Sequence, residues 1–301
     1  MIIMEQPPKF MPDKELSKVG GSLWLYIIMQ LTLSFLFSFV AMPLIMYSLY
    51  YDYSAINACI EMFISFISGI IILWFMSSSF KRRIKELKFT FKPKETIDTL
   101  AMMYFLNYAI GIIGALLSKF GLPDTSPDFS LNGGLLYNTF TFISVVVLAP
   151  IFEELIFRGM ILNHLTKYNK MFAIIVTSLL FGLLHLNITQ AIPAFFMSLV
   201  LCYMYVQTDS ILVTILVHAG NNFLALMSAY SNNILVTVLV LALVIYGLIT
   251  VILRSKEVNA FIKEEKTSEN WYARFFKRIP NLLYLIFTIL WIIISLFINM
   301  F

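Results

Sequence analysis

The chain has 301 residues, of which 60% are hydrophobic and only 13% are charged, and its mean hydropathy is +0.86. Soluble domains carry about 25% charged residues, so this composition excludes an ordinary globular protein and indicates a chain that crosses a membrane repeatedly. The net charge of +4 requires no nucleic-acid partner, because lysines beside anionic lipid headgroups account for it.

Apolar runs of roughly 20 residues, each long enough to cross a bilayer as a helix, recur along the chain. The predicted spans are 22–50, 55–79, 97–117, 137–166, 171–186, 189–206, 211–229, 234–253 and 281–300. The fifth and sixth runs are short. The sequence therefore predicts an all-α fold, a polytopic membrane helix bundle with about eight to nine transmembrane helices.

Basic residues are distributed unevenly between the segments that connect these spans. If successive spans cross the membrane in alternating directions, 19 of the 21 Lys and Arg residues lie on the same side of the membrane. Three precede the first span, seven lie from Lys81 to Lys94, two follow the fourth span and seven lie from Arg254 to Arg278. Cytoplasmic loops carry the excess of Lys and Arg, so the N-terminus is predicted to be cytoplasmic.

Four parts follow one another along the chain. They are a cytoplasmic tail at 1–21, N-terminal transmembrane helices at 22–134, a core of closely connected spans at 135–230 and C-terminal transmembrane helices at 231–301. In the last part, residues 254–280 mix basic and aromatic side chains and are predicted to form an interfacial amphipathic helix.

Three ionisable side chains interrupt the fourth span, in the run EELIFR at 153–158. A charge at mid-bilayer depth costs at least ~2.5–3.5 kcal/mol, so such residues face a protein interior and mark function. Glu154 and Arg158 share a helix face and are predicted to pair, whereas Glu153 points roughly 100° away and is left free for chemistry. Pro150 is predicted to kink the helix beside these carboxylates.

Two further polar pairs lie in later spans. His185 follows Phe181 by one helical turn, and His218 precedes Asn222 by four residues on one helix face. Taken alone, either pair could serve only to pack one helix against another. At ~1.5 Å per residue, however, Glu153, His185 and His218 all lie near the middle of a ~30 Å membrane core, which predicts a single polar site.

Other polar or reactive residues in the spans are assigned no function. His164 lies three residues before Lys167 and is predicted to be solvated or interfacial. Glu61 is predicted to snorkel or to pair helices. Cys59 and Cys202 lie far apart in the sequence and suit small buried positions, so no disulfide is predicted.

Together the three motifs resemble the CPBP intramembrane proteases, also called the CAAX prenyl protease 2 or Abi family. The family signature is EExxxR, then FxxxH, then HxxxN on successive membrane helices, and residues 153–158, 181–185 and 218–222 match it. The resemblance covers roughly residues 135–230. It implies a catalytic core and an intramembrane endopeptidase that acts on a membrane-associated protein or peptide.

The resemblance also implies a role for each polar residue. Glu153 with His185 would activate a water for attack on a peptide carbonyl, and His218 with Asn222 would stabilise the oxyanion. This mechanism needs no cofactor.

The pair of Glu154 and Arg158 would orient that site. An alternative is a zinc enzyme with His185, His218 and Glu153 as metal ligands, since catalytic zinc takes three protein ligands of these types. No HExxH motif is present, so metal-free chemistry is preferred.

Two other classes of function compete with a protease. One is a non-proteolytic membrane scaffold or bacteriocin-immunity protein, and the other is an ion-coupled transporter, which the absence of an internal repeat disfavours. The abundance of Ile, Lys, Asn and Phe indicates an AT-rich bacterial genome and hence a bacterial plasma membrane. The sequence indicates neither the oligomeric state nor whether a substrate is prenylated.

Overall fold

A computed structural model of the chain describes residues 14–47, 53–119, 131, 134–230 and 234–300. Almost all of these residues are helical, and none of them forms a strand. Among them, eight helices are long and apolar enough to cross a membrane, and one further apolar helix is shorter, at Lys170–Leu184. The predicted all-α membrane bundle is therefore confirmed.

The helices follow the predicted spans closely. Their bounds are α1 Lys14–Tyr47, α2 Tyr53–Ser79, α3 Pro93–Ser118, α4 Leu135–Phe142, α5 Ala149–Glu154, α6 Asn163–Leu165, α7 Lys170–Leu184, α8 Ile188–Thr208, α9 Ile211–Tyr230, α10 Ile234–Glu264, α11 Trp271–Phe276 and α12 Ile279–Met300. A short 3₁₀ turn lies at Ile84–Glu86, and π-helical segments at Ile143–Leu148 and Leu155–Leu162 join α4, α5 and α6 into one long helix.

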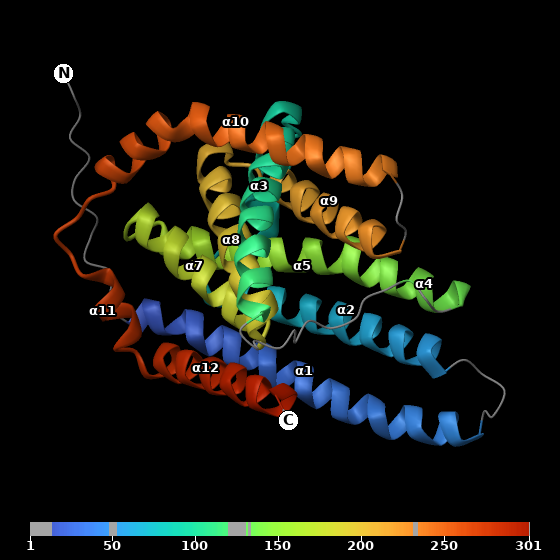
Figure 1. The fold of residues 1–301 in the computed structure, drawn as a ribbon. Coiled ribbons are helices and arrows are strands. Elements are labelled where there is room, and N and C mark those ends of the chain that lie inside the picture. The colour runs from blue at the N-terminus through green and yellow to red at the C-terminus, as the bar shows by residue number, and fades with distance from the viewer. Residues whose placement is uncertain (1–13, 48–52, 120–130, 132–133, 231–233, 301) are drawn as a thin grey trace.

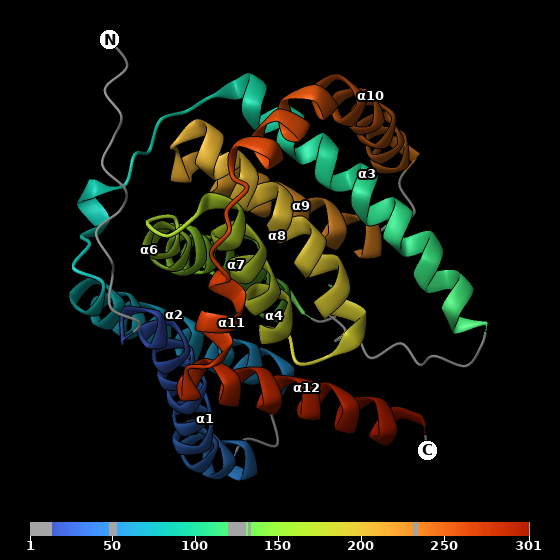
Figure 2. The same ribbon diagram turned by 90° about the vertical axis from the view of Figure 1, so that its left-hand side faces the viewer.

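Two helices cross the others at a steep angle. In Figure 1, α1, α2, α5, α9 and α10 run in roughly one direction, whereas α3 and α8 cut across them. The crossing helices pack against each other, and α10 covers α3. Figure 2 shows α1, α2 and α12 on one side, α3 and α10 on the other, and α7, α8 and α9 between them. The motif-bearing helices thus occupy the middle of the bundle.

The outer surface is apolar, as expected for a protein whose surroundings are lipid. Large side chains on the peripheral helices are exposed, for example Trp74 at 74% and Leu253 at 72%. The interior also contains a large cluster of buried apolar side chains. The polar groups that lie within the spans find their partners inside the bundle, because lipid offers them none. These features and the eight spans identify an integral membrane protein.

The segment 254–280 differs from the single interfacial helix predicted from its composition. Its first part continues α10, and a separate short helix, α11, follows. Arg254 Nη2, within α10, donates to Asp98 Oδ2 near the start of α3 at 2.9 Å, which fastens the two helices together. Asn270 then caps α11 by accepting from the Ala273 amide at 3.0 Å, so the chain begins a new helix there.

His164 is buried, and the prediction of a solvated or interfacial histidine was wrong. Its ring is 3% exposed and stacks on Phe80, with ring centroids 4.5 Å apart. Its Nε2 lies 3.0 Å from the carbonyl oxygen of Glu15, so the first turn of α1 covers it. Packing between helices distant in the sequence therefore overrides the proximity of Lys167.

Candidate active site

The helix that carries the two glutamates is irregular on both sides of them. The π-helical segments 143–148 and 155–162 flank α5. Pro150 lacks an N–H, so the Val146 carbonyl loses its partner one α-helical turn later, and a wider π-helical pattern accommodates this loss. The predicted irregularity beside the carboxylates thus takes the form of π-helical turns, which are frequent at functional sites.

Asparagine side chains bind carbonyl groups of both π-helical segments. Asn222 on α9 donates from Nδ2 to the Val145 carbonyl at 2.9 Å. Asn163 donates from Nδ2 to the carbonyls of Arg158 and Gly159, at 3.0 and 3.1 Å. Buried carbonyls need such partners. Asn222 therefore connects α9 to the helix that carries the glutamates.

The predicted pair of Glu154 and Arg158 is present, and both side chains are 0% exposed. Arg158 Nη1 donates to Glu154 Oε1 at 2.9 Å, and Nη2 donates to Ser198 Oγ on α8 at 2.9 Å. The guanidinium also lies over the Phe181 ring, 4.8 Å from its centroid. A buried charge held at three points fixes the positions of α5, α7 and α8 relative to one another.

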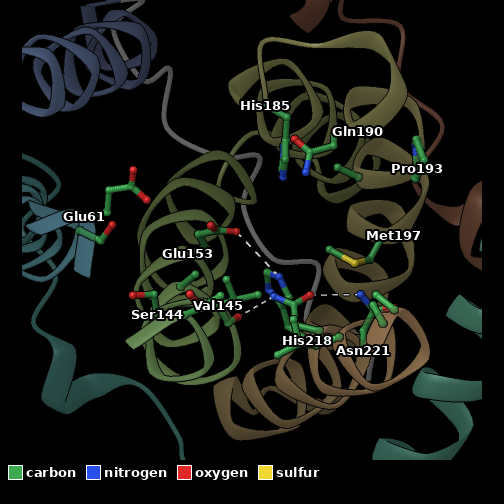
Figure 3. Close-up of a pocket in the computed structure, with 18 of the residues that line it drawn as sticks. Glu61, Ser144, Val145, Glu153, His185, Gln190, Pro193, Met197, His218 and Asn221 are labelled. Atoms are coloured by element: carbon green, nitrogen blue, oxygen red, sulfur yellow. Dashed lines mark hydrogen bonds and ion pairs between the residues drawn. The ribbon is translucent and has the colours of Figure 1, made fainter. Parts of the chain in front are cut away.

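His218 lies between the two glutamates. Its Nδ1 is 2.9 Å from Glu154 Oε1, while its Nε2 is 3.8 Å from Glu153 Oε2. The second separation is longer than a hydrogen bond. Figure 3 shows Glu153 and His218 facing each other across one end of a cavity. Glu154 is thus committed to Arg158 and His218, and Glu153 is not.

His185 ends α7 and faces the same cavity from another wall (Figure 3). Its Nδ1 lies 3.0 Å from the carbonyl oxygen of Phe181, the other residue of its motif, which orients the ring. The next residue, Leu186, has a φ of 57°, a left-handed conformation that is strained for leucine. The sharp turn lets Asn187 cap α8 by accepting from the Gln190 amide at 2.8 Å.

Two neighbouring cavities meet at the proposed catalytic residues. The larger has a volume of about 920 Å³ and the smaller of about 330 Å³. Glu153, His185, Ser65 and Ala149 line both of them. The larger cavity continues past His218 along α9, and the smaller is bounded by Tyr26, Ile27, Gln30 and Leu31 of α1.

Several residues of this site were missed by the sequence analysis. Ser198 is one of them, because a lone serine in an apolar helix gives no sign of its partner. Asn57, Glu61 and Ser65 form a polar stripe at four-residue spacing on α2 and line the larger cavity. Asn57 Nδ2 donates to Glu61 Oε1 at 2.7 Å. That spacing was the signal available, since it places all three on one helix face.

The zinc alternative does not fit the arrangement of these side chains. Among the described residues, no group of three or more His, Cys, Asp or Glu side chains lies close enough together to hold a metal ion. His218 Nδ1 is occupied by Glu154, so only its Nε2 faces the cavity. The independence of the reaction from metal stays a prediction.

Comparison with known families places this site within a recognised domain. Residues 135–224 match the family model of the type II CAAX prenyl endopeptidase Rce1-like proteins. This segment belongs to the CPBP family. The CPBP segment begins with α4, ends within α9 and contains all six predicted site residues, namely Glu153, Glu154, Arg158, His185, His218 and Asn222.

The CPBP match supports a protease of the CAAX type with a membrane-associated protein as its substrate. No curated protein and no solved structure matches the chain. Helices α1 to α3 and α10 to α12 lie outside the CPBP segment.

Proposed function

We propose that the chain is an intramembrane endopeptidase that hydrolyses a peptide bond of a membrane-associated protein or peptide with a water activated by Glu153 and His185. One observation carries this proposal. Glu154 is held by Arg158 and His218, whereas Glu153 faces both cavities together with His185. A carboxylate that faces a cavity large enough for water is suited to act as a general base.

In this mechanism, the water lies between the Glu153 carboxylate and the His185 ring. Glu153 removes a proton from the water as its oxygen attacks the carbonyl carbon of the peptide bond, and a tetrahedral oxyanion forms. The protonated Glu153 then gives that proton to the leaving nitrogen as the carbon–nitrogen bond breaks. Glu153 thus passes on the proton that it took from the water, and its carboxylate is ready for the next reaction.

His218 and Asn222 supply the donors for the oxyanion. Asn222 uses one Nδ2 hydrogen for the Val145 carbonyl and keeps the second for the substrate. Because His218 gives its Nδ1 hydrogen to Glu154, its Nε2 donates only when the ring is an imidazolium.

The proposal is tested by comparing membrane peptides in cells that carry the wild type or Glu153→Gln. An intramembrane endopeptidase predicts that specific peptides accumulate, uncleaved, in the variant. A cellular phenotype of the null strain that Glu153→Gln restores fully, with no peptide accumulating, would instead indicate a non-proteolytic scaffold or immunity protein.

A further inference from the structure

The larger cavity extends from Glu153, His185 and His218, whose position in the bundle we call the catalytic level, towards one end of the bundle. Along α9 its lining runs from His218 through Asn222 to Ala225 and Ala229, and α9 ends one residue later. On α4 it reaches Tyr137, two residues after that helix begins. Ala225 and Ala229 are exposed. Among the residues that the structure describes, the cavity therefore reaches the surface at the end where α4 begins and α9 ends.

Towards the other end, packed apolar side chains close the site. Phe157 and Met160 on the glutamate-bearing helix are 0% exposed, as are Val213 and Val217 on α9. Leu180 on α7 is also 0% exposed. All five lie between the catalytic level and the opposite helix ends. Interiors packed in this way leave few voids large enough for water, so these described side chains close the site in that direction.

The closed end is the end that carries the positive charge. Figure 1 shows the starts of α1 and α7 and the end of α10 on the left, and the starts of α2 and α4 and the end of α9 on the right. Lysines and arginines flank the left-hand ends, including Lys167, Lys170 and the run from Arg254 to Lys266. Basic loops remain on the cytoplasmic side of a membrane. The positively charged end of the bundle is therefore the cytoplasmic end.

We propose that the active site opens to the non-cytoplasmic face of the membrane and takes substrates whose scissile bond lies on that side. The substrate class is an exported peptide or the outward-facing segment of a membrane protein, rather than a cytoplasmic C-terminal tail. The substrate class rests on the proposed proteolytic function, whereas the direction of the opening does not.

The polar stripe on α2 supports this direction. Asn57, Glu61 and Ser65 line the cavity, and α2 begins at the open end, four residues before Asn57. Polar side chains inside a membrane span are costly unless they face protein or water. A hydrated passage along this stripe would bring both the hydrolytic water and a polar peptide segment to Glu153 from outside.

The direction of the opening is tested with a membrane-impermeant maleimide on intact cells. The background carries Cys59→Ala, and the remaining Cys202 is fully buried. Ala229→Cys reports on the cavity mouth, with Ala225→Cys as a second position. Lys85→Cys, on the exposed turn between α2 and α3, is the matched control.

We expect Ala229→Cys and Ala225→Cys to react in intact cells, and Lys85→Cys to react only after the membrane is permeabilised. The reverse pattern, or labelling of the mouth positions only after permeabilisation, would overturn the proposal. These outcomes do not depend on any catalytic activity, so they test the opening separately from the proposed function.

The substrate class is tested in the peptides that accumulate in Glu153→Gln cells. We expect their cleavage positions, mapped from the fragments in wild-type cells, to lie in exported or outward-facing segments. Cleavage positions confined to cytoplasmic segments would overturn this inference while leaving the proteolytic function standing. If no peptide accumulates, the proposed function and the substrate class fail together, and the direction of the opening is decided by labelling alone.

Discussion

His218 Nδ1 lies 2.9 Å from Glu154 Oε1, the same oxygen that accepts the hydrogen bond from Arg158. One carboxylate oxygen therefore links a cation on its own helix to a ring on α9. Because the ring is held on one side, its other nitrogen is fixed in direction towards Glu153 and the cavity. In the proposed reaction, Glu154 is thus a positioning residue, and Glu153 is the catalytic residue.

Removal of the buried cation should impair both folding and activity. Arg158→Ala leaves Glu154 buried without its cation and Ser198 without its donor, and breaking a buried pair costs about 3–5 kcal/mol. We expect a lower melting temperature of the purified protein in detergent and little cleavage. Lys85→Ala, at an exposed position, is the control and should melt like the wild type. An unchanged melting temperature for Arg158→Ala would contradict the structural role of the pair.

Substitution of Asn222 should lower the catalytic rate more than it lowers substrate binding. Asn222→Ala removes an oxyanion donor, which typically costs about 10²–10³ in kcat, and it also leaves the Val145 carbonyl without its partner. Steady-state kinetics should show the loss in kcat with KM nearly unchanged. If the loss disappears at low temperature, where a destabilised protein stays folded, Asn222 would be a purely structural residue.

The three histidines should respond differently to substitution. His185→Ala and His218→Ala should each abolish cleavage without unfolding the protein, because each removes a ring that faces the cavity. His164→Gln is the matched control, since His164 is buried against Phe80 away from the cavity. We expect this control to melt at a lower temperature but to cleave normally per folded molecule. Normal cleavage by His185→Ala would remove this residue from the mechanism.

The sequence predicted those features that depend on spacing along a single helix. Four-residue spacing placed Arg158 beside Glu154. Counting residues from the helix ends predicted one polar site for Glu153, His185 and His218, and all three line the larger cavity. Features that depend on contacts between distant segments could not be predicted. The burial of His164 requires α1 to cover it, and the hydrogen bond from Arg158 to Ser198 requires a particular face of α8.

Purified enzyme should contain no stoichiometric zinc and should keep its activity after prolonged treatment with a membrane-permeable chelator. The reason is that the use of His218 and Glu153 as ligands would leave Asn222 alone at the oxyanion and no free general base. Metal analysis of the protein and activity after chelation are the two measurements. Zinc at one per chain, with activity lost on stripping and restored by zinc, would establish the metalloenzyme instead.

Glu153→Gln tests most directly whether the Glu153 carboxylate activates the water, because the amide keeps the shape of the side chain but cannot accept the proton. The measurement is cleavage, by purified enzyme in reconstituted vesicles, of a membrane peptide that accumulates in cells lacking the enzyme. Glu86→Gln, on the exposed turn after α2, is the control. We predict a loss of at least about 10²–10⁴-fold in kcat for Glu153→Gln, with unchanged melting temperature. Cleavage by Glu153→Gln at the wild-type rate would contradict the account.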